Sequence, residues 1–158
     1  MTLEELFAGR SIDIDKVMDR LQQVAAAEGL PLGIRKYTYN SRLAQELSKW
    51  AEYEGKGREF HQKIFEAYFA EGKNIGRQDI LVEAARSVGL PGLGAQEVLE
   101  KRTFKEAVDM DWIMANSMGI TAVPTFVIDK KGLVGAQPYE MLEKFLQDNN
   151  VPERLPKN

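Results

Sequence analysis

Apolar residues recur every three or four positions along most of the chain, the spacing that places them on one face of an α-helix. In residues 11–29, for example, Ile14, Val17, Leu21 and Val24 form such a stripe. The same spacing predicts further helices over residues 40–55, 58–72, 78–89, 103–119 and 138–150. Each of the first five segments ends at a glycine, the residue that most often follows the last turn of a helix.

The pattern changes after residue 119, where short runs of β-branched and aromatic residues replace the helical spacing. Residues Thr125–Ile128 and 133–136 are two such runs, separated by the four residues DKKG. They predict a β-hairpin in which Gly132 is free to take the positive φ of the turn. The glycine-rich stretch 89–94 predicts instead a loop that leads into a short helical turn.

Composition limits the classes of protein that this chain can represent. It has 158 residues, of which 44% are hydrophobic and 28% charged, as in one globular domain. The net charge of -3 argues against nucleic acid as a partner. No apolar stretch reaches the length of about 18 residues that a membrane span needs. The first ten residues lack the basic and apolar regions of a secretory signal, so we expect a cytoplasmic location.

The absence of cysteine closes most routes to covalent chemistry. These 158 residues can form no disulfide, thiolate nucleophile, redox pair or cysteine-bound metal site. His61 is the one histidine, and without a neighbouring nucleophile motif we expect an ordinary surface residue. The acidic residues Glu4, Glu5, Asp109 and Asp111 lack the spacing of a calcium-binding loop. We therefore expect no catalytic residue, no cofactor and no metal ion.

Several aromatic side chains stand at helical spacing and are numerous enough to line a pocket. They are Trp50, Phe65, Tyr68, Phe69 and Trp112. Aromatic residues in such stripes usually form the core of a helical domain, so we expect these five to be core residues.

The C-terminal part of the sequence resembles a known family. The string GITAVPTFVIDKKGLVGAQPYEMLEKFL, which starts at Gly119, looks like the second half of a thioredoxin fold, with a helix, a Val-Pro bond, a β-hairpin and a closing helix. More narrowly, VPTFVID followed by GAQP resembles the FrnE-like branch of the DsbA family of thiol–disulfide oxidoreductases. NSRLAQEL (40–47) and IFEAYFAEGKNI (64–75) are similar to the helical region that this family inserts into its thioredoxin domain.

The resemblance implies an α+β fold that is mostly helical. The helical insertion would cover about residues 11–119, and the C-terminal hairpin and helix of the thioredoxin fold about residues 120–148. Family members begin with a strand, a C-x-x-C motif that opens a helix, and a second strand, none of which is present here. We therefore expect one DsbA-like domain over residues 1–158 without this N-terminal unit, through natural truncation, a misassigned start or trimming.

The family also suggests a binding site at the Val-Pro bond. In family members this proline is cis, and the residue before it pairs with an extended substrate beside the reactive cysteines. The resemblance thus implies that Val123 and Pro124 are substrate-binding residues joined by a cis bond. A trans proline at the start of a strand is the alternative. Peptide or thiol substrates are expected only for the full-length family.

Without the N-terminal unit, the strand after Pro124 would lack its usual neighbour. Thr125–Ile128 would then be an open edge of β-branched and aromatic residues, which favours pairing with another chain. A two-stranded hairpin alone is marginally stable in water. We therefore expect a homo-oligomer, most simply a homodimer, formed through this edge or through the neighbouring apolar helix surface.

Three functional hypotheses remain. The chain is a member of the thiol–disulfide oxidoreductase or isomerase family that is inactive because it has no redox sulfur. Alternatively, it is a non-catalytic module that binds a partner or a second copy of itself. A further alternative is the glutathione-dependent branch, the kappa-class transferases and the 2-hydroxychromene-2-carboxylate isomerases. These share the Val-Pro hairpin but use a serine in the segment that is absent here.

Overall fold

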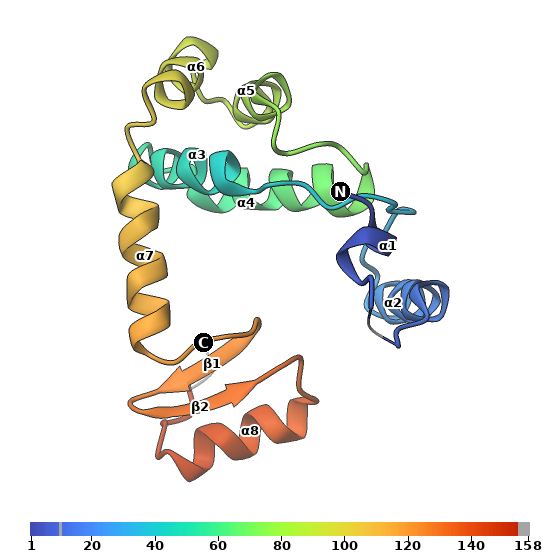
Figure 1. Cartoon of the computed structure of the whole chain (residues 1–158). Coiled ribbons are helices and arrows are strands. Elements are labelled where there is room, and N and C mark those ends of the chain that lie inside the picture. The colour runs from blue at the N-terminus through green and yellow to red at the C-terminus, as the bar shows by residue number, and fades with distance from the viewer. Residues whose placement is uncertain (10, 155–158) are drawn as a thin grey trace. The chain divides into compact units, whose positions relative to one another are not determined.

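The computed structural model describes residues 1–9 and 11–154, which divide into two compact units (Figure 1). The first is Met1–Val108 and the second Asp109–Asn158. Helices dominate, and the strands form one two-stranded sheet, so the predicted mostly helical α+β class is confirmed. The single domain expected over residues 1–158 stays a prediction. Within the described ranges, no helix combines the length and the hydropathy needed to cross a bilayer.

The first unit is built from helices. They are α1 (Leu3–Leu6), α2 (Ile14–Ala27), α3 (Arg42–Tyr53), α4 (Gly57–Phe65), the π-helical turn η1 (Glu66–Ala70), α5 (Gln78–Ser87) and α6 (Gly92–Lys101). Helices α3 and α4 lie side by side, and α5 and α6 pack against them (Figure 1). The largest fully buried apolar side chains of this core are Phe60, Leu47, Leu81 and Leu99.

The start of the chain is held by local capping and by a short β-bridge. The side chain of Thr2 accepts a bond from the Glu5 N–H, and the Glu5 carboxylate accepts one from the Thr2 N–H, which is a capping box. Thr2 also bridges to Tyr37 in antiparallel fashion. Ser11 and Asp13 both precede the apolar stripe of α2 and are of a type that caps helices, and the structure shows Asp13 in this role, accepting a bond from the Lys16 N–H. Nevertheless, α2 has no buried residue.

Helix α6 is longer than the sequence indicates. The glycines at positions 92 and 94 predict a loop there, but α6 runs through both for ten residues. Burial of Ala95 and Leu99 outweighs the poor helix propensity of glycine. Gly94 also has a packing reason, because a Cβ at this position would lie 3.2 Å from Cζ2 of Trp50.

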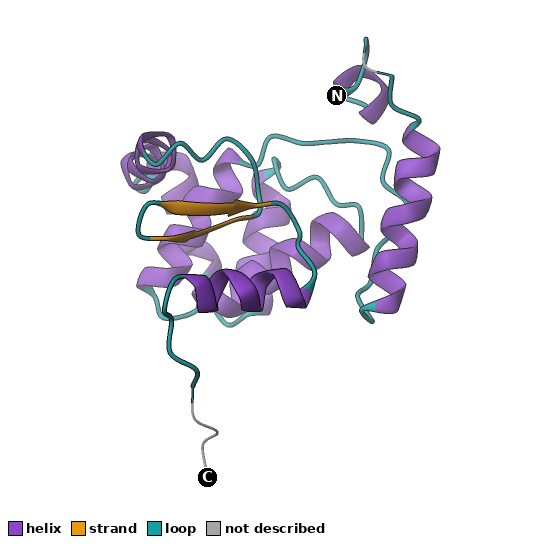
Figure 2. Ribbon diagram, turned by 90° about the horizontal axis from the view of Figure 1, so that it is seen from below, coloured by secondary structure: helices purple, strands orange, loops and turns teal. Residues whose placement is uncertain are grey.

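The second unit contains the later part of α7 (Lys105–Ser117), then β1 (Thr125–Ile128), β2 (Lys131–Val134) and α8 (Tyr139–Asp148). The two strands pair antiparallel, with Thr125 opposite Val134 and Ile128 opposite Lys131. Figure 2 shows the hairpin with α8 alongside it. The tail VPERLPKN (151–158), in which two prolines and few apolar residues predict a frayed end, is described only as far as residue 154.

The hairpin turn differs from the prediction. The sequence predicts the second strand at 133–136 after a four-residue turn, but β2 begins at Lys131, so only Asp129 and Lys130 form the turn. A two-residue connection matches the twist of the paired strands better. The positive φ falls on Asp129, at 53°, because aspartate tolerates this region, and Gly132 lies within β2 instead.

Candidate functional site

Val123 and Pro124 lie in the loop between α7 and β1. The peptide bond that joins them is cis. Val123 is 89% exposed, and Pro124 is also exposed. The loop therefore presents both predicted binding residues to solvent, at the point where the chain enters the sheet.

Two hydrogen bonds hold this loop against the hairpin. The Thr125 hydroxyl donates to the carbonyl of Ala122 at 2.6 Å. The N–H of Gly135 donates to the carbonyl of Pro124 at 2.8 Å. The second bond extends the hairpin by one position beyond β1 and β2. The loop therefore continues the hairpin by one further residue pair, Pro124 with Gly135.

The hairpin register determines which backbone groups of β1 face β2. Ile128 and Lys131 are opposite each other and close a two-residue turn, so they form a hydrogen-bonded pair. Hydrogen-bonded and non-hydrogen-bonded pairs alternate along an antiparallel ladder. The next hydrogen-bonded pair is therefore Phe126 with Leu133.

The remaining groups of β1 form its outer edge. The bond from Gly135 to Pro124 continues the same alternation. It follows that the N–H and C=O groups of Thr125 and Val127 point away from β2, and that Val123 stands next on the same side. Within the described part of the chain, β2 is the strand that pairs with β1, and the opposite side of β1 carries no strand.

The chemistry available at this site is that of backbone recognition. Neither Val123 nor Pro124 has an ionisable or nucleophilic side chain, and proline has no N–H to donate. Outward N–H and C=O groups at alternate positions are what an added β-strand requires, and apolar side chains beside them can contact its side chains. The arrangement can bind an extended segment, but it supplies no acid, base or nucleophile.

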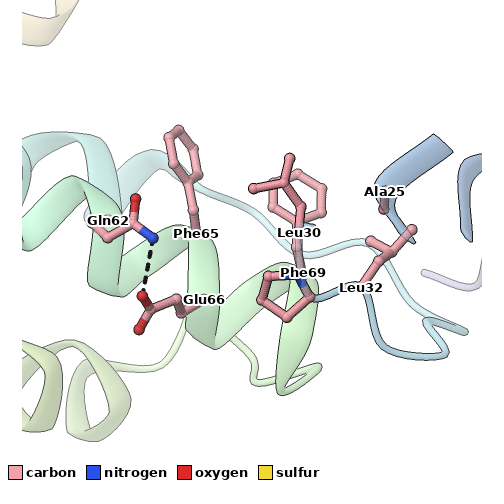
Figure 3. A pocket seen from close by; sticks show the side chains of 8 residues that line it. Ala25, Leu30, Leu32, Gln62, Phe65, Glu66 and Phe69 are labelled. Atoms are coloured by element: carbon pink, nitrogen blue, oxygen red, sulfur yellow. Dashed lines mark hydrogen bonds between the residues drawn. The ribbon is translucent and has the colours of Figure 1, made fainter. Parts of the chain in front are cut away.

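Figure 3 shows a second candidate, an apolar groove of about 310 Å³ in the first unit. It is lined by Ala25, Leu30, Pro31, Leu32, Gln62, Phe65, Glu66 and Phe69.

The sequence prediction of Phe65 and Phe69 as core residues is wrong, since they are 58% and 38% exposed. The buried face of this helical segment carries Phe60, Ile64 and Ala67, and residue 65 is turned about 100° from residue 64.

The other predicted core aromatics divide in the same way. Trp50 is buried and Tyr68 is half-buried, as expected, whereas Trp112 is 53% exposed on α7.

His61 is exposed, with its Nε2 3.8 Å from a carboxylate oxygen of Glu52. Across residues 1–9 and 11–154, no group of three or more His, Asp or Glu side chains is placed to hold a metal ion.

Sequence reasoning missed an ionic cluster around the buried carboxylate of Glu46, a residue that is 1% exposed. Arg102 donates to this carboxylate from Nε and Nη2, both at 2.6 Å, and Arg42 donates from Nε at 2.7 Å. The guanidinium of Arg102, assisted by that of Arg42, holds the pKa of Glu46 below its usual range despite burial. Arg42 also donates to the Lys105 carbonyl, at 2.8 Å. The cluster therefore ties α3 to the corner between α6 and α7.

Comparison with known proteins identifies the family. The family model of the DSBA-like thioredoxin domain matches residues 6–147. The chain belongs to this family. The solved structure of a probable DsbA oxidoreductase from Streptomyces coelicolor is similar over 99% of the chain and 69% of its own length, with a TM-score of 0.84 and 28% identity. The assignment to the FrnE-like branch stays a prediction.

Further relatives show how much of a longer protein the chain represents. It is 37% identical to the uncharacterized protein YwbO of Bacillus subtilis, over 67% of this chain and 54% of that protein. It is 30% identical to the ClpXP adapter protein SpxH of Halalkalibacterium halodurans, over 68% of this chain and 39% of that protein. The chain thus spans about half or less of these curated relatives.

A more distant structure shares the fold alone. The 2-hydroxychromene-2-carboxylate isomerase is 20% identical, with a TM-score of 0.73 over 89% of this chain and 71% of that one. At this identity the likeness extends to the arrangement of the backbone and carries no conclusion about activity.

Proposed function

We propose that the polypeptide of residues 1–158 is a non-catalytic member of the DsbA-like family that binds an extended polypeptide segment at the Val123–Pro124 loop and the outer edge of β1. The observation that carries this proposal is the open edge of β1, where Val123, Thr125 and Val127 present backbone groups on one side. An incoming strand would form main-chain hydrogen bonds there, as in other β-strand additions.

Thiol–disulfide exchange does not fit this polypeptide. Exchange begins when a thiolate attacks a disulfide sulfur, and the sequence contains no cysteine. Methionine cannot replace it, because a thioether has no proton to lose and forms no mixed disulfide. The oxidoreductase activity in the name of the Streptomyces coelicolor structure is therefore a property of that protein, and we do not extend it to these 158 residues.

A binding role also agrees with one of the relatives. SpxH, at 30% identity, is named as an adapter protein, which is a function based on contact with partners. A protein that matches 68% of this chain is thus named as an adapter. The cytoplasmic location expected from the sequence stays a prediction.

The proposal is tested with insulin in two assays. In the dithiothreitol-driven reduction of insulin, we expect the polypeptide to leave the rate at its uncatalysed level, since it supplies no thiolate. In a nitrogen–proton NMR titration with reduced, alkylated insulin B chain, we expect amide shifts at Val123, Thr125 and Val127. Catalysis by the polypeptide alone, or shifts confined to the first unit, would contradict the proposal.

A further inference from the structure

The side chain of Gln137 is bonded to the outer edge of β2. Ile128 and Lys131 are the hydrogen-bonded pair next to the turn, and bonded and non-bonded positions alternate along the ladder. The N–H and C=O groups of Gly132 and Val134 therefore point away from β1. Gln137 donates from Nε2 to the carbonyl of Val134 at 2.7 Å. One of the outward backbone groups of β2 is thus already bonded by this chain itself.

The backbone that follows β2 places Gln137 at this carbonyl. Gly135 has a φ of 93°, and its N–H is held by the carbonyl of Pro124. A Cβ at Gly135 would lie 3.5 Å from Nε2 of Gln137, so the amide lies close against this turn. Pro138, the next residue, is the N-cap of α8. The turn and the start of α8 thus fix the chain on both sides of Gln137, whose side chain is half-buried.

This bond obstructs the addition of a strand to β2. An added strand needs both the N–H and the C=O of each outward residue, and at Val134 the carbonyl is occupied. The incoming strand would have to break this bond and displace the Gln137 side chain. Apart from this bond, Val134 favours strand addition, since it is β-branched and 55% exposed. Gln137 therefore acts at the position of β2 where a neighbouring strand would otherwise be accepted.

We propose that Gln137 is an autoinhibitory contact, which blocks the outer edge of β2 against a strand from a second copy of the chain. Unprotected edge strands are templates for such pairing, and proteins commonly cover them with side chains. Both partners of the contact lie in the second unit. The proposal concerns the edge opposite to the outer edge of β1, and it holds whether or not β1 binds an extended segment.

Three variants test this contact. Gln137→Ala removes the donor from the edge. Gln137→Lys keeps a donor there and adds a charge, which also protects an edge strand. Asn149→Ala is the matched control, because Asn149 likewise donates from its amide to a carbonyl at 2.7 Å, that of Phe145, but on α8.

Self-association and amide exchange are the two measurements. In sedimentation velocity over a range of concentrations, we expect Gln137→Ala to self-associate roughly tenfold more strongly than the wild type, because no bond has to be given up at the edge. Gln137→Lys and Asn149→Ala should match the wild type. In hydrogen exchange, the N–H of Val134 should become protected as the concentration rises in Gln137→Ala alone. Circular dichroism of each variant shows whether its helices are intact.

Several results would overturn the proposal. Gln137→Ala may not associate as weakly as the wild type does, and its association may not leave the exchange of Val134 unchanged. Equal association of Gln137→Ala and Asn149→Ala would show a general effect of losing an amide. Association of Gln137→Lys as strong as that of Gln137→Ala would contradict the blocking role, and so would protection of Val134 that rises with concentration in the wild type.

Discussion

The Glu46 carboxylate connects parts of the first unit that are far apart in the sequence. It lies between Arg42, one turn earlier on α3, and Arg102, which ends α6 with a φ of 53°. The positive φ of Arg102 directs the chain from α6 into α7, and its two bonds to Glu46 hold that corner on α3. The Glu46 carboxylate is 1% exposed, so breaking its bonds to the two guanidinium groups is costly, because a desolvated charge then loses hydrogen bonds that stabilise it.

Glu46→Gln should lower the free energy of unfolding by about 2 kcal/mol, since the neutral amide loses the charge-assisted bonds and leaves two guanidinium groups facing it. Urea denaturation followed by circular dichroism measures this change. Glu97→Gln is the matched control, because the Glu97–Lys101 ion pair is equally short, at 2.7 Å, but solvent-exposed. We expect no measurable change in the control. Equal effects of the two substitutions would contradict the structural role of Glu46.

The same variant has a defined pH dependence. The folded-state pKa of Glu46 lies below the ordinary value of 4.5, so the stability that the carboxylate contributes is complete above about pH 4.5. It is lost as the pH falls through the lowered pKa, because the unfolded chain takes up the proton first. The difference in unfolding free energy between wild type and Glu46→Gln should therefore shrink in acid. A free-energy difference that stays constant as the pH falls would contradict the lowered pKa of Glu46.

The hairpin depends on the backbone conformation at its open end. Gly135 has a φ of 93°, where L side chains are strained, and its N–H donates to Pro124. Gly132, inside β2, has room for a methyl group, since a Cβ there would lie 4.0 Å from Cγ2 of Thr125. Although both are glycines of one short segment, only Gly135 needs to be glycine.

Gly135→Ala should therefore destabilise the hairpin by about 1 kcal/mol, whereas Gly132→Ala should leave it unchanged or slightly more stable. Amide hydrogen exchange of Phe126 and Ile128, whose N–H groups face β2, measures this directly. We expect roughly fivefold faster exchange in Gly135→Ala, the factor that corresponds to this free energy. Faster exchange in Gly132→Ala than in Gly135→Ala would show that the hairpin requires glycine at position 132 and not at position 135.

At the level of elements, the sequence predicted most helices because their apolar spacing is local information. Prediction from the sequence failed where contacts between residues far apart in the chain determine the local structure. Helix α6 forms because Ala95 and Leu99 are buried by α3 and α5, and the partner that Arg102 finds in Glu46 is 56 residues away. The hairpin was predicted, but its register was displaced by two residues, because glycine was expected to provide the turn and Asp129 provides it.

For the whole molecule, the resemblance in VPTFVID and NSRLAQEL led to the correct family, which the match over residues 6–147 confirms. The predicted site residues Val123 and Pro124 are consecutive in the sequence and lie in an exposed loop. The outward direction of the β1 backbone could not be predicted, since it follows from the register of the hairpin. The role of this edge in binding stays a proposal.

Hydrogen exchange at the amides of β1 in the wild-type chain tests the central claim most directly. We expect the N–H groups of Thr125 and Val127 to exchange rapidly in the polypeptide alone and to become protected when reduced, alkylated insulin B chain is added, because an extended segment then covers them. The N–H groups of Phe126 and Ile128, which face β2, should change much less. If Thr125 and Val127 exchange at the same rate with and without the insulin B chain, the outer edge of β1 does not bind an extended segment.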